Sequence, residues 1–397
     1  MKITSFQFSG KDPLAVTQAA SGAIRDRSNG LDPDLLFVFY SSTQSIMDSR
    51  QLIIEEFPHT KIVACTSEKG IISNNINFYN MDQAIGIAAF YDQEGAYGVA
   101  SGFINAGSFK ESVQQIITEA LQDCDRQGEI PKLVWFYSHN KDQGKIIDIL
   151  ENHFGSSIPI FGGVPGWCKD MRSCYDHNNI FFDENYLLLV LMYPSCEVKT
   201  RFGSLYVPTK YNGIVTRVED DHVIEIDYKS AYEVYTGWLN KFVPRELFDE
   251  TQDYLSEMIE YHPLGIQIGV SGNVQNYQIF QIKKTFEEQE LITFNQFKFG
   301  DRITLLTLDK NNSFEHEFQT QLMFNDSYFD SSRIYGIISV SCGGYRSQFT
   351  QKNLKFLEKV TQPLMGFISS GEQGRFTNGS NHESNLMLES VIFYERH

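Results

Sequence analysis

Apolar runs and amphipathic segments alternate along the first part of the chain. Residues 34–42 form an apolar run that predicts a buried strand, and residues 47–57 follow it with a helical pattern. Residues 61–67 form a second apolar strand, and further strand patterns lie at residues 83–92 and 96–103. Strands interleaved with single helices are typical of an α/β fold.

The same order of elements recurs roughly a hundred residues later. The second copy consists of a strand, a helix, a second strand and two further strands, at residues 132–140, 142–154, 158–163, 185–194 and 197–203. A repeat with the same order and similar spacing predicts two related halves, about residues 1–107 and 108–210.

A fainter third copy closes the chain. Its strand, helix and two further strands are predicted at residues 333–349, 351–360, 362–374 and 385–396. We expect the later strands of each copy to run antiparallel, which makes the sheets mixed. The predicted fold class is therefore α/β, with mixed sheets built from repeated strand–helix–strand–strand units.

Two more helices precede the first two copies. Residues 12–27 begin with Asp12, a natural N-cap, and Pro13, which suits the first helical turn. Residues 108–124 show the apolar spacing of an amphipathic helix.

The charge of the chain narrows the classes of partner. The formal net charge is −17 at pH 7, whereas binding to nucleic acid or to an anionic membrane surface requires a basic face. No apolar run is long enough to span a bilayer, and the first residues lack the pattern of a signal peptide. We therefore expect a soluble cytoplasmic protein that binds no nucleic acid and does not insert into membranes.

Small polar residues and glycines follow several of the predicted strands. The groups at these strand ends are Cys65, Thr66, Ser67, Gly162, Gly163, Cys342, Gly343, Ser370 and Glu372. Ligands of open α/β sheets bind beyond the carboxyl ends of strands, where small residues let them approach the backbone. The alternative is that the glycines only make tight turns.

The sequence contains none of the usual catalytic signatures that we sought. Glu372 stands where a phosphate-binding loop needs lysine, and neither a Gly-x-Ser-x-Gly elbow nor a His-Glu-x-x-His motif occurs. Cys168, Cys174 and His177 lie within ten residues and could bind a metal, although reduced thiols are the alternative.

Motifs along almost the whole chain resemble those of the FIST family. "VACTSEKGIIS" (residues 63–73) and "IPIFGGVPG" (residues 158–166) are similar to the two signatures of the FIST N domain. Matches to the FIST C domain follow in family order at residues 215–239, 262–266, 299–306, 340–346 and 366–372. The resemblance implies a FIST N domain over residues 1–210, made of the two related halves, and a FIST C domain over residues 211–397.

The resemblance implies a sensory protein rather than an enzyme. FIST domains are regarded as small-ligand sensors in signal transduction, with amino acids proposed as ligands. A bacterial subgroup of stand-alone FIST proteins resembles haem-binding nitric-oxide sensors that act on a separate histidine kinase. Since the two FIST domains fill this chain, we expect its partner to be separate, either a histidine kinase or a cyclic-dinucleotide signalling enzyme.

Each ligand implies its own set of residues. Haem iron needs an axial side chain, and the candidates are His177 first, then His382 and His139. An amino acid would place its carboxylate on Arg346 and its ammonium on Glu372, beside Cys342, Ser370 and Thr66. The enzymatic alternative uses Cys342 or Cys65 as nucleophile.

Overall fold

A computed structural model describes most of the chain. The described residues are 1–28, 30–41, 43–75, 77, 83–168, 171–182, 184–242, 258–272, 274–285, 290–309, 313–322, 333–345, 348 and 350–395. They form two compact units, of which the first comprises Met1–Gly203, Phe318–Glu383 and Met387–His397. The second comprises Ser204–Glu317 and Ser384–Leu386. The sequence boundary between residues 210 and 211 stays a prediction.

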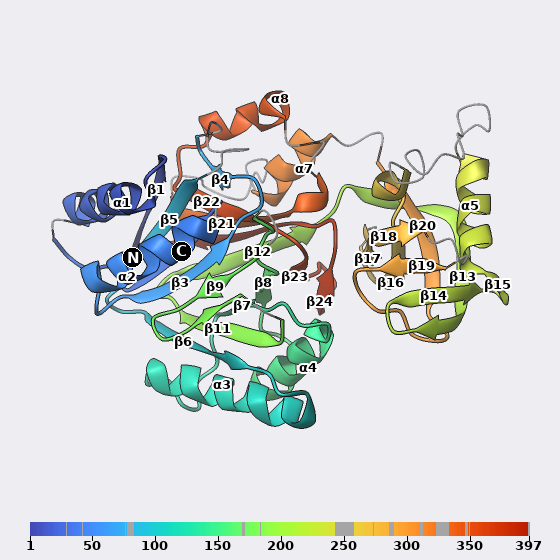
Figure 1. The fold of residues 1–397 in the computed structure, drawn as a ribbon, viewed down its shortest axis with the longest axis horizontal. Helices are drawn as coiled ribbons and strands as arrows, with labels where there is room; N and C mark the ends of the chain where they lie inside the picture. The colour runs from blue at the N-terminus through green and yellow to red at the C-terminus, as the bar shows by residue number, and fades with distance from the viewer. Residues whose placement is uncertain are drawn as a thin grey trace. The chain divides into compact units, whose positions relative to one another are not determined.

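Three mixed sheets with a common plan form the first unit (Figure 1). The first sheet has the order β1-β5-β2-β3-β9-β10, with the bounds β1 Lys2–Ser9, β2 Leu35–Tyr40, β3 Lys61–Thr66, β5 Ala84–Tyr91, β9 Cys174–Tyr175 and β10 Ile180–Phe181. Strands β2 and β3 are parallel, and β5 runs antiparallel to β2. The predicted α/β class with mixed sheets is confirmed.

The second and third sheets repeat this arrangement. The second has the order β24-β23-β8-β7-β11-β6, with β6 Ala96–Phe103, β7 Leu133–Tyr137, β8 Ile160–Gly163, β11 Tyr186–Tyr193, β23 Glu372–Arg375 and β24 Asn381–Ser384. The third has the order β12-β25-β21-β22-β4, with β4 Ile71–Ser73, β12 Glu197–Gly203, β21 Ile334–Cys342, β22 Leu364–Ser369 and β25 Leu388–Tyr394. Pairs β7–β8 and β21–β22 are parallel, as β2–β3 is.

The structure reassigns the last strand of the first two copies. Strand β6 pairs with β11 in the second sheet, and β12 pairs with β25 in the third, so each belongs to the next copy. Both edges of β5 are already paired, with β1 and β2, and both edges of β11 are paired with β6 and β7. Neither strand can therefore accept the strand that follows it in the chain.

The three sheets also exchange short strands in a closed cycle. Strand β4 comes from the first copy and pairs with β22 of the third sheet. Strand β9 comes from the second copy and pairs with β3 of the first sheet, and β23 from the third copy pairs with β8 of the second. Each copy thus covers the open edge of another copy's second parallel strand, which brings the carboxyl ends of those strands together.

Helices cover the outer faces of the first two sheets, as Figure 1 shows. Helices α1 (Pro13–Ser28) and α2 (Thr43–Glu56) pack on the first sheet, and α3 (Phe109–Asp123) and α4 (Gln143–Phe154) pack on the second. Asp12 caps α1, because its Oδ1 accepts the Leu14 amide at 3.0 Å. The predicted third helix is shorter than expected: α8 spans Gln351–Leu354 and continues as a 3-10 turn over Lys355–Lys359. Helix α7 covers Phe314–Gln321.

Aromatic rings from the inner faces of the three sheets meet in one core. The ring of Phe37 lies 5.3 Å from that of Trp135, and Phe39 lies 5.3 Å from Phe367. Tyr137 also contacts Phe367, at 5.6 Å between ring centroids. Because helices cover the outer faces and these rings fill the inner side, β2 is buried on both faces, which explains its unbroken apolar run.

The second unit contains an antiparallel sheet and helix α5 (Ala231–Phe242). Its strands are β13 Tyr206–Glu219, β14 His222–Ile226, β15 Lys229–Ser230, β16 Leu264–Ser271, β17 Val274–Phe280, β18 Ile282–Thr285, β19 Leu291–Thr293 and β20 Arg302–Leu308. Helix α5 buries Tyr235, Trp238 and Leu239 in the core of this unit.

Gly366→Ala is expected to destabilise the first unit. A Cβ at Gly366 in β22 would lie 2.0 Å from the backbone oxygen of Ser339 in the neighbouring strand β21. The pair would have to move apart, which we expect to cost about 1–3 kcal/mol of unfolding free energy. Urea unfolding followed by circular dichroism measures the change.

Gly22→Ala is the matched control. Gly22 lies within α1, and a Cβ there meets nothing within 4 Å. This variant is expected to be more stable by about 0.5–1 kcal/mol. Equal stability of Gly366→Ala and the wild type would contradict the close approach of β21 and β22.

Candidate functional site

The carboxyl ends of β3, β8 and β22 meet in a junction joined by hydrogen bonds. The Ile368 amide donates to Ser67 Oγ at 2.9 Å, and the Glu68 amide donates to the Ile368 carbonyl at 3.0 Å. The Gly166 amide donates to the Thr66 carbonyl at 2.8 Å, and the Ser370 amide to the Val164 carbonyl at 3.0 Å. The structure therefore brings Thr66, Ser67 and Ser370 together, as the sequence suggested.

Glycines at this junction allow the chain segments to approach closely. A Cβ at Gly166 would lie 2.3 Å from both the Glu68 amide nitrogen and the Ile368 carbonyl oxygen. A Cβ at Gly343 would lie 2.6 Å from a carboxylate oxygen of Glu68, and one at Gly163 would lie 3.0 Å from the Gly371 carbonyl oxygen. Gly162 has a φ of 136°, and its Cβ would lie 2.0 Å from the Phe136 carbonyl oxygen. These glycines serve close packing of the protein on itself.

Two carboxyl groups are buried beside the junction. Glu372 bonds to Ser369 Oγ and accepts the Met387 amide at 3.1 Å, next to the Cys342 thiol. Burial raises the pKa of Glu372 to about 7, against the lowering effect of these donors. Burial also raises the pKa of Glu389 well above its usual value, and the nearby Glu372 adds to this. Within the described residues neither carboxylate oxygen of Glu389 has a hydrogen-bond partner.

Two tyrosine side chains lie next to the buried thiols of Cys65 and Cys174 near the junction. Tyr137 lies against the thiol of Cys65, and Tyr186 lies against that of Cys174. Burial raises the pKa of both thiols well above the usual range, so neither is a thiolate at neutral pH. This environment does not favour Cys65 as a nucleophile.

The proposed metal ligands do not converge. Cys168 donates its thiol to the Ser67 carbonyl at 3.2 Å, whereas the His177 carbonyl accepts a bond from Arg50 at 2.9 Å. Among the residues that the structure describes, no group of three His, Cys, Asp or Glu side chains could hold a metal ion. The alternative of reduced thiols at Cys168 and Cys174 fits better.

The three candidate haem ligands lie apart in different surroundings. His177 borders a cavity of about 210 Å³ that Lys61, Asp123 and Asp176 also line. This volume is below the roughly 300–1,000 Å³ typical of small-molecule pockets, so the cavity beside His177 does not fit a haem. Burial lowers the pKa of His177.

His382 lies on β24 of the second sheet, and His139 lies between β7 and α4. His139 Nε2 lies 3.8 Å from Glu184 Oε1. The His382 ring packs against Phe376 at 6.0 Å, and burial lowers its pKa although Glu151 and Asp148 are near. Arg346, the predicted partner of a ligand carboxylate, lies outside the described residues.

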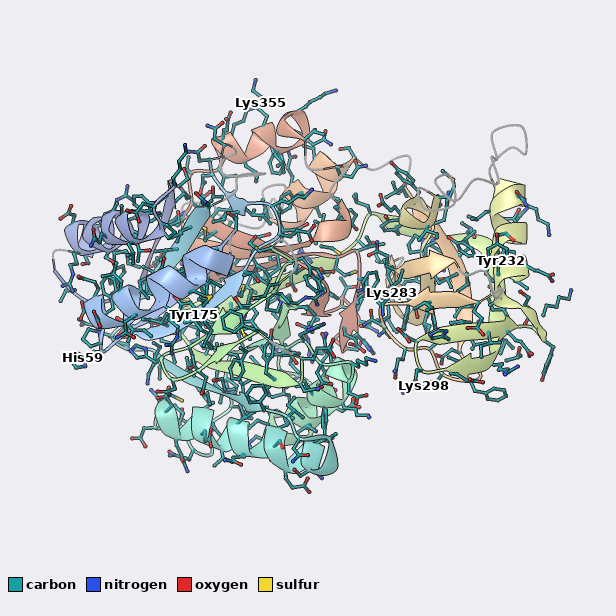
Figure 2. All side chains as sticks on the ribbon, viewed as in Figure 1. His59, Tyr175, Tyr232, Lys283, Lys298 and Lys355 are labelled. Carbon is teal, nitrogen blue, oxygen red and sulfur yellow. The ribbon has the colours of Figure 1, made fainter. Side chains whose placement is uncertain are left out.

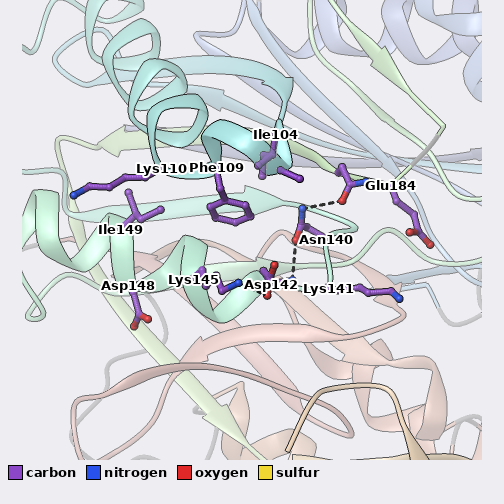
Figure 3. Close-up of a pocket in the computed structure, with 12 residues that line it drawn as sticks. Ile104, Phe109, Lys110, Asn140, Lys141, Asp142, Lys145, Asp148, Ile149 and Glu184 are labelled. Atoms are coloured by element: carbon purple, nitrogen blue, oxygen red, sulfur yellow. Dashed lines mark hydrogen bonds and ion pairs between the residues drawn. The ribbon is translucent and has the colours of Figure 1, made fainter. Parts of the chain in front are cut away.

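A larger cavity opens where β7 ends and α4 begins (Figure 3). Its volume is about 600 Å³, within the range of small-molecule pockets. The lining residues are Ile104, Ala106, Phe109, Lys110, Asn140, Lys141, Asp142, Lys145, Asp148, Ile149, Glu184 and Asn185. The cavity thus combines an apolar wall with lysine ammonium groups and carboxylates.

Hydrogen bonds hold the rim of this cavity in place. Asn140 Oδ1 accepts the Asp142 amide at 2.7 Å, and Asn140 Nδ2 donates to Asn185 Oδ1 at 3.0 Å (Figure 3). Lys145 pairs with Asp142 at 2.9 Å and lies 5.9 Å from the centre of the Phe109 ring. Asp142 is the N-cap residue of α4 and Lys145 lies in its first turn, so the N-terminal end of this helix borders the cavity.

Sequence reasoning missed this cavity and one partly buried arginine. The guanidinium of Arg172 lies 3.9 Å from the centre of the Trp167 ring, and burial lowers its pKa to about 10. Its charged neighbours are Glu184, on the cavity rim, and Glu68, at the junction. The position of the cavity at a strand end was the available signal, because "SHNKD" follows β7 directly.

Figure 2 shows Tyr175 inside the first unit and His59 at its edge.

Glu372→Gln is expected to remove part of the pH dependence of stability. The unfolded pKa is near 4.5 and the folded pKa about 7, so protons are lost from the unfolded chain first as pH rises. The wild type should therefore lose roughly 3 kcal/mol of unfolding free energy between pH 4.5 and pH 7 from this group. Urea unfolding at pH 5 and pH 8 measures this loss.

Glu94→Gln is the control, because Glu94 lies in an exposed turn. It should keep the pH dependence of the wild type, whereas Glu372→Gln should reduce it. Identical profiles for Glu372→Gln and the wild type would show that folding does not shift the pKa of Glu372.

Comparisons with known proteins agree with the family that the motifs suggested. The FIST N domain model matches residues 34–229, and the FIST C domain model matches residues 231–375. No curated protein matches the chain. A crystal structure of cyanuric acid hydrolase from A. caulinodans aligns with a TM-score of 0.37 at 8% identity, covering 100% of this chain and 99% of the other. No helix in the described parts of the chain is long and apolar enough to cross a membrane. The two domain matches together cover most of the chain, which therefore belongs to the FIST family of sensory, ligand-binding domains.

Proposed function

We propose that this protein is a sensor that binds a small zwitterionic metabolite, such as an amino acid, in the cavity between β7 and α4. The cavity carries the proposal, because its volume of about 600 Å³ suits such a ligand and its lining offers both charges. Membership of the FIST family supports a sensory role.

The positive groups of the cavity suit a carboxylate. Lys141 lies two residues before α4, and Lys110 lies on the first turn of α3. The first turn of α4 adds the positive end of the helix dipole. A ligand carboxylate near Lys141 would therefore meet both a charge and a favourable dipole. The prediction of Arg346 as a carboxylate partner stays untested, because Arg346 lies outside the described residues.

The negative and apolar groups suit the rest of the ligand. Asp148 and Glu184 line the cavity and offer carboxylates to an ammonium group. Phe109, Ile104 and Ile149 offer an apolar wall to a side chain. A ligand with opposite charges at one end and an apolar body uses all three kinds of group.

The proposal that the sensor signals to another protein is supported only by its membership of the FIST family. A ligand changes signalling only if it binds two states of the protein with different affinity. We propose a separate partner, a histidine kinase or a cyclic-dinucleotide signalling enzyme, as the reader of that difference.

Lys141→Gln is expected to weaken ligand binding. The loss of a charge-assisted contact to the carboxylate should lower affinity by about 10-fold to 100-fold. Thermal-shift screening of the twenty amino acids identifies the ligand, and calorimetry then compares the variants. Asp148→Asn should weaken binding similarly through the ammonium.

Lys229→Gln is the matched control, since Lys229 is an exposed lysine of the second unit. It should bind the ligand as the wild type does. If no amino acid stabilises the protein, or if Lys141→Gln binds with unchanged affinity, this cavity is not the amino-acid site.

Haem with nitric-oxide sensing remains the second candidate ligand and function, on the ground of the family resemblance. The cavity at His177 is too small for haem, so His177→Ala should leave any haem absorption of the protein unchanged. Absorption spectra of protein from haem-supplemented cells, before and after reduction and nitric oxide, test this. The controls are His139→Ala and His382→Ala. A Soret band that moves only in His177→Ala would identify His177 as the axial ligand.

A further inference from the structure

Cys65 and Cys174 lie directly opposite each other on neighbouring strands. They are register partners in the antiparallel pair β3–β9. The next pair along the ladder carries a backbone bond, from the Thr66 amide to the Ser173 carbonyl at 2.9 Å. Cys65 and Cys174 therefore occupy a non-hydrogen-bonded position, where Cα atoms lie about 4.5 Å apart. That separation falls within the range of about 4.4–6.8 Å that a disulfide spans.

The surroundings of the two thiols are also suitable for a bond between them. Both are free thiols with 0% exposure, and each lies within electrostatic range of the other. Side chains of directly opposed residues lie on the same face of a sheet. Tyr137 of β7 and Tyr186 of β11, both in the second sheet, border Cys65 and Cys174 respectively.

We propose that Cys65 and Cys174 form a site of reversible oxidation, at which a small-molecule disulfide converts the two thiols into a cross-strand disulfide. One protein thiolate attacks the small disulfide and releases one small thiol. The second protein thiolate then attacks the mixed disulfide and releases the other. The protein loses two electrons and two protons, which the two small thiols carry away.

The bond would join two different copies of the repeat. Strand β3 belongs to the first copy, and β9 comes from the second and covers the open edge of β3. The cross-link would close a loop of roughly 110 residues, so it restricts the unfolded chain strongly. Oxidation would thereby lock one of the three exchanged strands in place.

Access to the thiols requires local opening. Burial keeps both groups protonated and therefore slow to react. Strands β9 and β10 contain two residues each and form the edge of the first sheet. Such short edge elements open at a lower free energy than the rest of a sheet. Oxidation should therefore accelerate in dilute urea and at higher pH.

Peptide mapping of the full chain tests the proposal. The protein is incubated with oxidised glutathione, with and without dilute urea, alkylated, digested without reductant and analysed by mass spectrometry. We expect a cross-linked pair of peptides that contain Cys65 and Cys174, and a Tm raised by about 5 °C or more. Dithiothreitol should reverse both changes.

Two variants separate this site from other cysteines. Cys174→Ala should abolish the cross-link and the Tm increase, whereas Cys196→Ala, at another buried cysteine, should retain both. The mapping of the unaltered chain decides the question even if Cys174→Ala folds poorly. The proposal is overturned if Cys65 is linked instead to its neighbour Cys168, or if no cross-link forms under conditions in which both thiols become alkylated.

Discussion

The cyclic exchange of short strands among three sheets is the constraint on which the first unit depends. A second parallel strand at a sheet edge leaves backbone N–H and C=O groups unpaired, and burial makes unpaired groups costly. In each sheet a segment from another copy covers that edge, through β9, β23 and β4. No copy completes its own sheet, so the three copies must assemble together. Their strand ends are consequently held in one junction.

This convergence buries polar and ionisable side chains in the interior of the first unit. Hydrogen-bond donors around Glu372 partly offset the cost of burying its carboxyl group. Glu389 on β25 instead lies opposite two apolar residues, Val340 on β21 and Phe202 on β12. Burial favours the protonated form of both carboxyl groups, and the nearby Glu372 adds to this effect at Glu389. Glycines 166 and 343 close the space that a ligand would need. The junction therefore joins the three copies through close backbone packing, and ligand binding at these strand ends stays a prediction.

The repeat could be predicted from sequence because its apolar strands and amphipathic helices are strongly periodic. Helices α1, α3 and α4 lie within two residues of their predicted ends. The exchange could not be predicted, since β4, β9 and β23 contain only two to four residues and carry no periodic signal. The small residues at the strand ends did indicate a shared location. Their role was less visible, because a glycine needed for packing and a glycine needed for a ligand look alike in sequence.

The cavity lies at the edge of the junction of β3, β8 and β22 and not within it. Charged side chains connect the cavity to the junction. Glu184 lines the cavity and lies near both His139 and the partly buried Arg172. Arg172 in turn has Glu68 of the junction among its charged neighbours. A ligand ammonium that pairs with Glu184 would weaken the electrostatic attraction between Glu184 and Arg172. Arg172 is partly buried and lies over the Trp167 ring, so a change in its pairing acts on a side chain that is packed against the protein. Within the proposed function, this gives ligand binding an electrostatic route to the junction that joins all three copies.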